Sequence, residues 1–382
     1  MQKMMNAGTI TTKRIEGFNS NMTIGIEAER ANNPVKTGVE HYAKQLILQL
    51  AEIDTTNQYI LYLRTKPEDW FLNLPKNFRV KILGYGSIPF PYLWTQLRLS
   101  WEMLVSAPDV LLVPAASLPI IHPKRSVITV HDVAWRLYPE TFKILKRWYL
   151  EFTTWFACRF AHRVIAVSNA TKKDLVKYYK VDGSKVEVVY HGYEAGDHNT
   201  ETSLSLPEKY IVFIGTIQPR KNIIGLIEAF TELKRDHPEL SHKLVIAGRV
   251  GWKPEETLVK IKSNSDVVYL GHVSDNDRWP ILRYASLYVL PSFYEGFGIP
   301  ILEAFSMHVP VATANVSSMP EVAGDAAVYF DPKNISEIKK AMQDVLLDKS
   351  LADRLVEKGD LRLQEFSWRN CGQQTHQILI QS

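Results

Sequence analysis

The stretch Ser292–Ala304, with the sequence SFYEGFGIPILEA, sets the carboxylates of Glu295 and Glu303 eight positions apart across a glycine-rich turn. The apolar run Leu287–Leu290 before it predicts a buried strand, and Pro300 fixes a backbone angle that suits the first turn of a helix. We therefore expect the turn at the carboxyl end of a strand, where open α/β sheets bind ligands. The prediction is a polar pocket with Glu295 in the turn and Glu303 in the first helical turn.

The spacing of the two carboxylates alone is compatible with two interpretations. A helix amino terminus favours anionic groups through its free N–H groups and its dipole, so a glutamate there can simply stabilise the helix. A Gly-x-Gly pair around an aromatic residue is also common in loops. From these residues alone, a ligand site and a structural helix start are about equally favoured.

Short apolar runs alternate with longer amphipathic runs, which indicates parallel sheets with helices on both faces. The pattern restarts after the polar stretch 195–207, which is typical of a linker. We predict an α/β fold with two Rossmann-like domains, residues 21–195 and 208–362, and a flexible extension at residues 1–20. The expected strands are Met22–Ile26, Tyr59–Leu63, Val80–Leu83, Val110–Val113, Val127–Val130, Val164–Val167 and Val186–Val189, then Tyr210–Ile214, Leu244–Ala247, Val267–Leu270, Leu287–Leu290, Val311–Thr313 and Ala327–Phe330.

Composition limits the classes of protein that this chain can belong to. The 382 residues are 46% hydrophobic and 23% charged, which is ordinary for a soluble globular protein with two domains. A net charge of +4 does not by itself imply nucleic acid, and it is compatible with phosphorylated substrates or an anionic membrane surface. The two cysteines, Cys158 and Cys371, suggest neither a disulfide framework nor a structural zinc.

Targeting signals are not evident in the sequence. Residues 1–20 lack the apolar core of a secretory signal, and no run of about 18 uninterrupted apolar residues occurs. We expect a cytoplasmic protein whose only membrane contact would be peripheral, on the inner face of the cell membrane.

Residues 291–332 closely resemble the signature region of retaining GT-B glycosyltransferases of the fourth family, the glycosyl transferases group 1. The resemblance runs from Ser292–Ala304 through Pro310–Val311 and Ser317–Val322 to Gly324–Ala327 and Asp331–Pro332. It implies a GT-B fold, in which two Rossmann-like domains face each other across a cleft. It also implies that a last helix around Leu361–Ile380 crosses back onto the first domain, with residues 363–382 as the crossing segment, although Trp368 could equally be plain core.

The same resemblance implies an enzyme that moves a hexose from a nucleotide diphosphate sugar to a hydroxyl of a glycan or polyprenyl-linked acceptor. Mannose from GDP-mannose is preferred, because Val130–Asp132 and Tyr294–Glu303 look most like bacterial mannosyltransferases of lipopolysaccharide or polysaccharide assembly. The alternative donor is UDP-glucose or another UDP-sugar. Two alternatives from other classes remain. A nonhydrolysing sugar-nucleotide epimerase shares the two-domain architecture. A noncatalytic sugar-nucleotide-binding protein is less favoured, because such a protein should have lost the charged site residues that this chain retains.

Arg220 and Lys221 follow the strand Tyr210–Ile214 at an expected helix start, where two adjacent cations oppose the helix dipole unless an anion joins them. The anion would be a diphosphate; the alternative is a pair of solvated surface charges with Asn222 as a helix cap. The resemblance implies that both cations bind the nucleotide diphosphate and stabilise the charge that grows on it, with Lys221 as the catalytic residue of the pair.

The resemblance also assigns the residues of the turn. Glu295 would accept hydrogen bonds from hydroxyls of the donor sugar, aided by backbone N–H groups around Phe297, Gly298 and Ile299, and Glu303 would hold the nucleotide ribose. A nucleophilic role for Glu295, by analogy with glycosidase carboxylates, is less favoured. The two carboxylates would therefore have different tasks.

His131 and Asp132 end the strand Val127–Val130 at another carboxyl edge. A lone histidine is often structural, and Asp132 could cap the next helix. The resemblance implies that His131 reaches across the cleft to the sugar near the reacting carbon. Gly38 precedes a helix in a loop that would contact acceptor or phosphate, or that is a plain helix start, and the two interpretations are about equally favoured because relatives often carry two glycines where this chain has Thr37 and Gly38.

Gly271–Asp275 follows a strand, and in relatives the equivalent stretch reads the base, which makes Val273 and Asp275 the candidates here. The triplet Asp275–Asp277 imitates a metal-binding Asp-x-Asp, but it leads into an expected helix at Arg278 with Ser274 or Asp275 as cap. The capping interpretation is preferred, so we expect no obligatory metal and no cofactor beyond the sugar nucleotide.

Residues 143–163 interleave cations with aromatic residues, of which Trp148, Phe152, Trp155 and Arg159 recur at helical spacing. This combination suits an anionic membrane interface, but an aromatic stripe is more often core. Core is the preferred interpretation, and contact with a membrane stays open.

Overall fold

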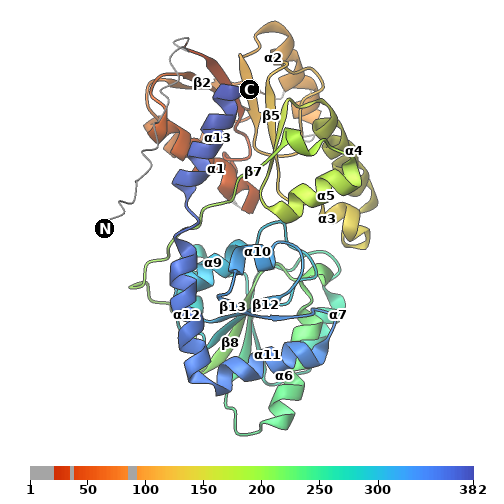
Figure 1. Ribbon diagram of the computed structural model, residues 1–382, viewed down its shortest axis with the longest axis vertical. Coiled ribbons are helices and arrows are strands. Elements are labelled where there is room, and N and C mark those ends of the chain that lie inside the picture. Colours follow the sequence, from red (N-terminus) through yellow and green to blue (C-terminus); the bar gives the residue numbers. More distant parts are fainter. Residues whose placement is uncertain (1–20, 35–37, 85–92) are drawn as a thin grey trace, which may run out of the picture.

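The structure is a computed structural model that describes residues 21–34, 38–84 and 93–382, apart from the side chain of Asp275. The predicted extension at residues 1–20 lies outside the described part. The chain forms two α/β domains, each built on a parallel sheet with helices on both faces, which confirms the predicted fold class (Figure 1).

The first sheet has seven parallel strands in the order β3-β2-β1-β4-β5-β6-β7. Side chains alternate between its faces, so Val110 and Leu112 enter one hydrophobic cluster while Leu111 and Val113 enter the other. The strands are short apolar runs because both faces are covered by helices. Their bounds are β1 (Thr23–Glu27), β2 (Gln58–Leu63), β3 (Phe78–Ile82), β4 (Val110–Val113), β5 (Ser126–Val130), β6 (Arg163–Ala166) and β7 (Val186–Val188).

The second sheet has six parallel strands in the order β10-β9-β8-β11-β12-β13. This order is that of a Rossmann fold, with the strand order reversing between β8 and β11. In open sheets of this kind, ligands bind outside the carboxyl ends of the two strands at the reversal. The bounds are β8 (Tyr210–Ile214), β9 (Lys243–Ala247), β10 (Val267–Gly271), β11 (Leu287–Leu290), β12 (Val311–Ala314) and β13 (Ala327–Phe330).

The helices connect successive parallel strands and cover the sheets (Figure 1). In the first domain they are α1 (Gly38–Ile53), α2 (Ser100–Val105), α3 (Ala134–Leu137), α4 (Ile144–Phe160) and α5 (Asn169–Tyr179). In the second domain they are α6 (Ile223–Asp236), α7 (Glu255–Lys262), α8 (Asp275–Arg283), α9 (Ile299–Ser306), α10 (Met319–Ala323), α11 (Ile335–Leu347) and α12 (Lys349–Leu363).

The last helix, α13 (Trp368–Gln381), packs beside α1 in the first domain (Figure 1). Trp368 is buried in the core cluster of that domain, so it is both core and part of the crossing helix. The predicted start near Leu361 is wrong, because α12 ends at Leu363 and the Ser367 hydroxyl caps a new helix at the N–H of Asn370. The two segments that join the domains, one after β7 and one between α12 and α13, touch each other at the start of α13. A Cβ on Gly192 would lie 2.1 Å from the backbone nitrogen of Trp368.

The preferred prediction for residues 143–163 is wrong. Trp148 is 64% exposed and Trp155 47%, and Phe152 is also exposed. The helix α4 instead buries its short side chains against the domain, because small residues let a helix approach its neighbours closely. These buried residues are Thr153, Thr154, Ala157 and Cys158. No helix in the described part of the chain is long and apolar enough to span a membrane.

Candidate active site

The turn after β11 lies at the carboxyl edge of the second sheet, as predicted, and it touches the first domain. The carbonyl of Gly296 accepts hydrogen bonds from the hydroxyls of Ser168 (2.7 Å) and Thr171 (3.2 Å). A Cβ at Gly296 would lie 1.9 Å from the His131 carbonyl oxygen. Only glycine therefore allows the two domains to approach this closely at the turn.

Helix α9 begins directly after Gly298, whose φ of +106° lies in the left-handed region that glycine adopts without strain. Pro300 occupies the first turn, as predicted. Glu303 lies one turn further on than predicted, because the helix already begins at Ile299. The turn thus delivers Glu295 to the edge of the sheet and Glu303 to the second turn of a buried helix.

Glu295 is paired with both predicted cations. Its Oε1 accepts hydrogen bonds from Lys221 Nζ and from the Ser292 hydroxyl (2.6 Å), and its Oε2 lies 3.3 Å from Arg220 Nη1. Arg220 also donates to the carbonyl of Tyr294. The loops after β8 and β11 therefore meet at the point where the strand order reverses.

Burial and the neighbouring charges shift the pKa values of Glu295 and Lys221 in opposite directions. Burial alone would raise the pKa of Glu295, but Lys221 and Arg220 lower it to about 2, so the side chain is a carboxylate at neutral pH. Burial lowers the pKa of Lys221, partly offset by Glu295. The anion that we expected beside the two cations is, in this structure, Glu295 itself.

Asn222 stands at the start of α6, but its side chain donates to the Pro332 carbonyl rather than capping the helix.

His131 lies at the carboxyl end of β5 on the opposite side of the domain interface. Its Nε2 is 3.0 Å from the Pro114 carbonyl, which can only accept, so this nitrogen carries the proton and Nδ1 holds the lone pair. Burial lowers the pKa of His131, which keeps the ring neutral. Asp132 accepts from the N–H of Ala134 (2.9 Å), but the N-cap of α3 is Val133, so the prediction that Asp132 caps this helix is wrong.

A second histidine, His191, belongs to the same cluster and was missed. Its ring centroid lies 5.4 Å from that of His131 and 5.0 Å from that of Phe297, and Tyr42 contacts both histidines. His191 is 3% exposed, and its Nδ1 has no hydrogen-bond partner among the described residues. Its place after β7, at the same carboxyl edge as His131, was the signal in the sequence that could have revealed it.

Glu27 was also missed, although it ends β1, where the strand order of the first sheet reverses. The side chain is 3% exposed; Oε1 accepts from the N–H of Glu29, and Oε2 has no partner among the described residues. Burial raises the pKa of Glu27 to about 7, against the effect of Arg30. The first domain thus holds a buried carboxyl group that titrates near neutrality.

The structure brings Glu303 to Arg278 rather than to the Glu295 cluster, with Glu303 Oε1 2.9 Å from Arg278 Nη1. Val273 is half-buried in the loop after β10. The side chain of Asp275 lies outside the described part. Gly38 opens α1, and a Cβ there would meet nothing within 4 Å, so close packing does not require glycine at this position.

The capping interpretation of the triplet Asp275–Asp277 is confirmed, because the Ser274 hydroxyl accepts from the N–H of Asp277 (3.1 Å). The predicted start at Arg278 is wrong, since the cap places the first residue of α8 at Asp275. The described residues contain no group of three His, Cys, Asp or Glu side chains that could hold a metal. The expectation that no metal is needed stays a prediction.

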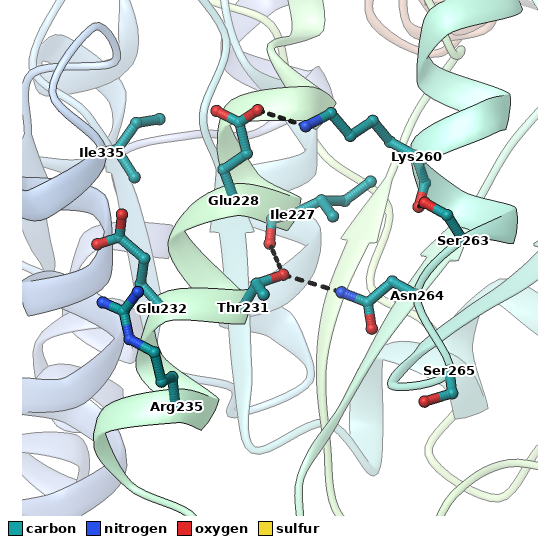
Figure 2. Close-up of a pocket in the computed structure, with 10 residues that line it drawn as sticks. All are labelled: Ile227, Glu228, Thr231, Glu232, Arg235, Lys260, Ser263, Asn264, Ser265 and Ile335. Carbon is teal, nitrogen blue, oxygen red and sulfur yellow. Dashed lines mark hydrogen bonds and ion pairs between the residues drawn. The ribbon is translucent and has the colours of Figure 1, made fainter.

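A separate hollow of about 610 Å³ lies between α6 and α7, near the amino ends of the strands (Figure 2). Its polar groups bond to one another: Lys260 Nζ is 2.7 Å from Glu228 Oε1, and the Asn264 amide donates to the Thr231 hydroxyl (2.8 Å). These groups are already satisfied, and the hollow lies at the edge opposite to Glu295.

Two family models together span most of the chain. The model for Glycosyltransferase Family 4 matches residues 36–196, and the model for Glycosyl transferases group 1 matches residues 197–362. The O-antigen chain mannosyltransferase B of Escherichia coli is 30% identical over 264 residues, covering 66% of this chain and 69% of that protein. The chain therefore belongs to the glycosyl transferases group 1 family, and the protein is a glycosyltransferase.

Solved structures agree on the fold. Sucrose-phosphate synthase from Thermosynechococcus elongatus has a TM-score of 0.74 and 17% identity, covering 94% of this chain and 98% of that one. Anabaena Alr3699/HepE, solved in complex with UDP and glucose, has a TM-score of 0.70 and 18% identity, covering 94% of this chain and 100% of that one. At these identities the similarity establishes the two-domain GT-B fold alone.

Proposed function

We propose that this glycosyltransferase moves mannose from GDP-mannose to a hydroxyl of a glycan or polyprenyl-linked acceptor, with retention of anomeric configuration. The observation that carries the proposal is the cluster of Arg220, Lys221 and Glu295 at the reversal point of the second sheet. The choice of mannose is supported by the Escherichia coli relative, which is named a mannosyltransferase.

Arg220 and Lys221 are the groups that would bind the diphosphate of the donor. Negative charge grows on the diphosphate as the glycosidic bond breaks, and preorganised cations at such a position contribute several kcal/mol to catalysis. The guanidinium has five N–H donors and the ammonium three, so both can keep Glu295 and still donate to phosphate oxygens. The cations would therefore serve the leaving group without giving up their buried partner.

Glu295 would hold the hydroxyls of the donor sugar rather than attack the anomeric carbon. A carboxylate with a pKa of about 2 that is already bonded to two cations is a weak base and a weak nucleophile. It keeps lone pairs for hydroxyl donors, because two carboxylate oxygens offer about four acceptor positions. The pairing thus favours the sugar-binding role over the nucleophilic one.

The remaining site residues keep the roles that the family resemblance implies. We propose that His131 contacts the sugar near the reacting carbon, with backbone N–H groups around Phe297, Gly298 and Ile299 assisting Glu295. Glu303 would hold the ribose, while Val273 and Asp275 would contact the base. Gly38 would approach acceptor or phosphate. No metal is required in this scheme, so transfer should be unchanged after treatment with a chelator.

The test is transfer from a panel of GDP- and UDP-sugars to a lipid-linked acceptor, with the product anomer assigned by nuclear magnetic resonance. We expect turnover with GDP-mannose and an α-linked product, since the donor itself is α-linked. A β-linked product would exclude retention, and faster turnover with UDP-glucose would exclude mannose as the substrate. Release of UDP with an altered free sugar, and no acceptor needed, would identify an epimerase instead.

We also propose that α4 rests on an anionic membrane at the cytoplasmic face. Its aromatic side chains are exposed, and Lys146, Arg147 and Arg159 lie among them. Aromatic residues suit the interface between water and lipid, while the cations are attracted to anionic headgroups. Sedimentation with anionic vesicles tests this, and equal binding to neutral vesicles at high salt would contradict it.

A further inference from the structure

A groove of about 1050 Å³ lies between the two domains, outside the Glu295 cluster. One wall is the segment 139–149, which leads into α4, and the other is formed by Trp252 and Lys253 in the loop before α7. In Figure 1, α4 and α7 lie on the same side of the molecule. The first turns of α4 therefore belong both to the groove and to the helix whose aromatic side chains are exposed.

The groove lining combines apolar side chains, here named its floor (Leu93, Phe142, Ile144 and Leu145), with cations, here named its rim (Lys143, Lys146, Arg147 and Lys253). Ile144 is 72% exposed and Leu145 85%, an arrangement that is unfavourable in water unless a second apolar surface covers it. Lys143, whose Nζ lies 5.3 Å from the centre of the Trp252 ring, stands at the rim with Lys253. Lys146 and Arg147 add two more cations to the lining, against one acid, Glu140.

Along the chain, the lining segment directly follows a residue that contacts the candidate active site. Tyr138 directly precedes the lining segment, and its hydroxyl donates to the carbonyl of Phe293 (3.1 Å) in the turn that bears Glu295. The rings of Tyr138 and Phe293 are stacked, with centroids 6.4 Å apart. The lining also includes the first residues of α4, and exposed Trp148 directly follows the lining cation Arg147.

From this arrangement we propose that the groove binds the lipid carrier of the acceptor, namely an isoprenoid chain that ends in a phosphate or diphosphate. The inference rests on the proposed transfer to a lipid-linked acceptor. The apolar floor takes the first isoprene units, and the cationic rim pairs with the phosphate. The chain then leads from the membrane face of α4 to the side of the turn, which places the attached sugar next to the donor.

Farnesyl diphosphate is the probe, and its binding to the full chain is measured by equilibrium dialysis. Saturating GDP is present, so that the Arg220 and Lys221 region is already occupied. The test variant is Leu145→Asp, and Leu72→Asp, a leucine that is 75% exposed in the first domain, is the matched control. We expect Leu145→Asp to weaken binding at least tenfold, because it sets a carboxylate in an apolar groove beside an anionic ligand, and we expect no change with Leu72→Asp.

Unchanged binding in Leu145→Asp would overturn the proposal, and so would an equal loss in Leu72→Asp or in Trp155→Asp on the outer face of α4. Inorganic diphosphate must bind at least tenfold more weakly than the probe, since equal binding would show that the chain plays no part. Transfer activity is measured separately. If no nucleotide sugar supports transfer while Leu145→Asp still abolishes probe binding, the proposed function fails and the groove assignment stands.

Discussion

The two domains repeat one strand order but differ in what they present at their surfaces. The second domain gathers charge at the carboxyl edge of its sheet and pairs it tightly, as in Lys221 with Glu295. The first domain exposes the aromatic side chains of α4 and buries Glu27, whose Oε2 has no partner in the described part. The same topology therefore presents a buried, paired charge cluster in one domain and an exposed aromatic helix face in the other.

Removal of the charge cluster should have the largest effect. We expect Lys221→Ala and Glu295→Ala each to lower kcat/KM by about a thousandfold or more, since each removes a preorganised charge worth several kcal/mol. The measurement is steady-state transfer at saturating acceptor. The control is Lys260→Ala, which removes a paired lysine in the same domain, away from the site. Near-normal turnover in either site variant would show that the charge cluster of the second domain takes no part in catalysis.

The contact between the domains comes next. Gly296→Ala places a methyl group about where the His131 carbonyl lies, so we expect the domains to separate and transfer to fall by about a hundredfold. Gly183→Ala is the control, because a Cβ there meets only Val176 at 3.8 Å. Small-angle scattering with and without donor nucleotide measures the separation. An unchanged profile together with full activity would show that the two domains work without this contact.

Glu27 distinguishes the first domain by its response to pH. The pKa of Glu27 is about 7 in the folded protein and near 4.5 in the unfolded chain, so ionisation of this carboxyl group favours unfolding. The contribution of Glu27 to the free energy of unfolding is therefore complete below pH 4.5 and is lost as the pH rises through 7. Glu27→Gln should therefore be more stable than the parent at pH 8, by at most about 3 kcal/mol, with a smaller difference at pH 5. Denaturant unfolding at both pH values measures this, with Glu52→Gln as a surface control. A gain of equal size at both pH values would be inconsistent with the titration of Glu27.

The smallest effect is expected on the outer face of α4. Trp155→Asp should weaken sedimentation with anionic vesicles by a few-fold, because one aromatic contact is lost and one repelling charge is added. The fold should be unaffected, since this side chain is 47% exposed. The control is Leu347→Asp, an exposed residue of the second domain. If both variants lose vesicle binding equally, α4 of the first domain is not the specific site of membrane contact.

Regular features of the fold were predictable, because they depend on local patterns. Every expected strand is present, since parallel strands buried on both faces are continuous apolar runs. The turn from Ser292 to Ala304 was placed correctly at a strand end, while Glu303 was misplaced by one turn because the helix start was not fixed by the sequence.

Features that depend on packing between distant segments were not predictable. The pairing of Glu295 with Lys221 joins loops 74 residues apart, and the meeting of His191 with His131 needs the register of two strands. The exposure of α4 was predicted wrongly, because a stripe of aromatic residues has the same periodicity whether it faces a core or solvent. Only the position of the small residues Thr154 and Ala157 decides which face turns inward.

The return of α13 to the first domain has a consequence for synthesis on the ribosome. Trp368, Cys371 and Leu379 belong to the core of the domain that is translated first. Cotranslational folding generally proceeds from the amino terminus, yet this core lacks one of its helices until the whole second domain has emerged. The first domain can therefore complete its core only after the whole second domain has been synthesised, and the surface of α1 that α13 covers stays exposed until then.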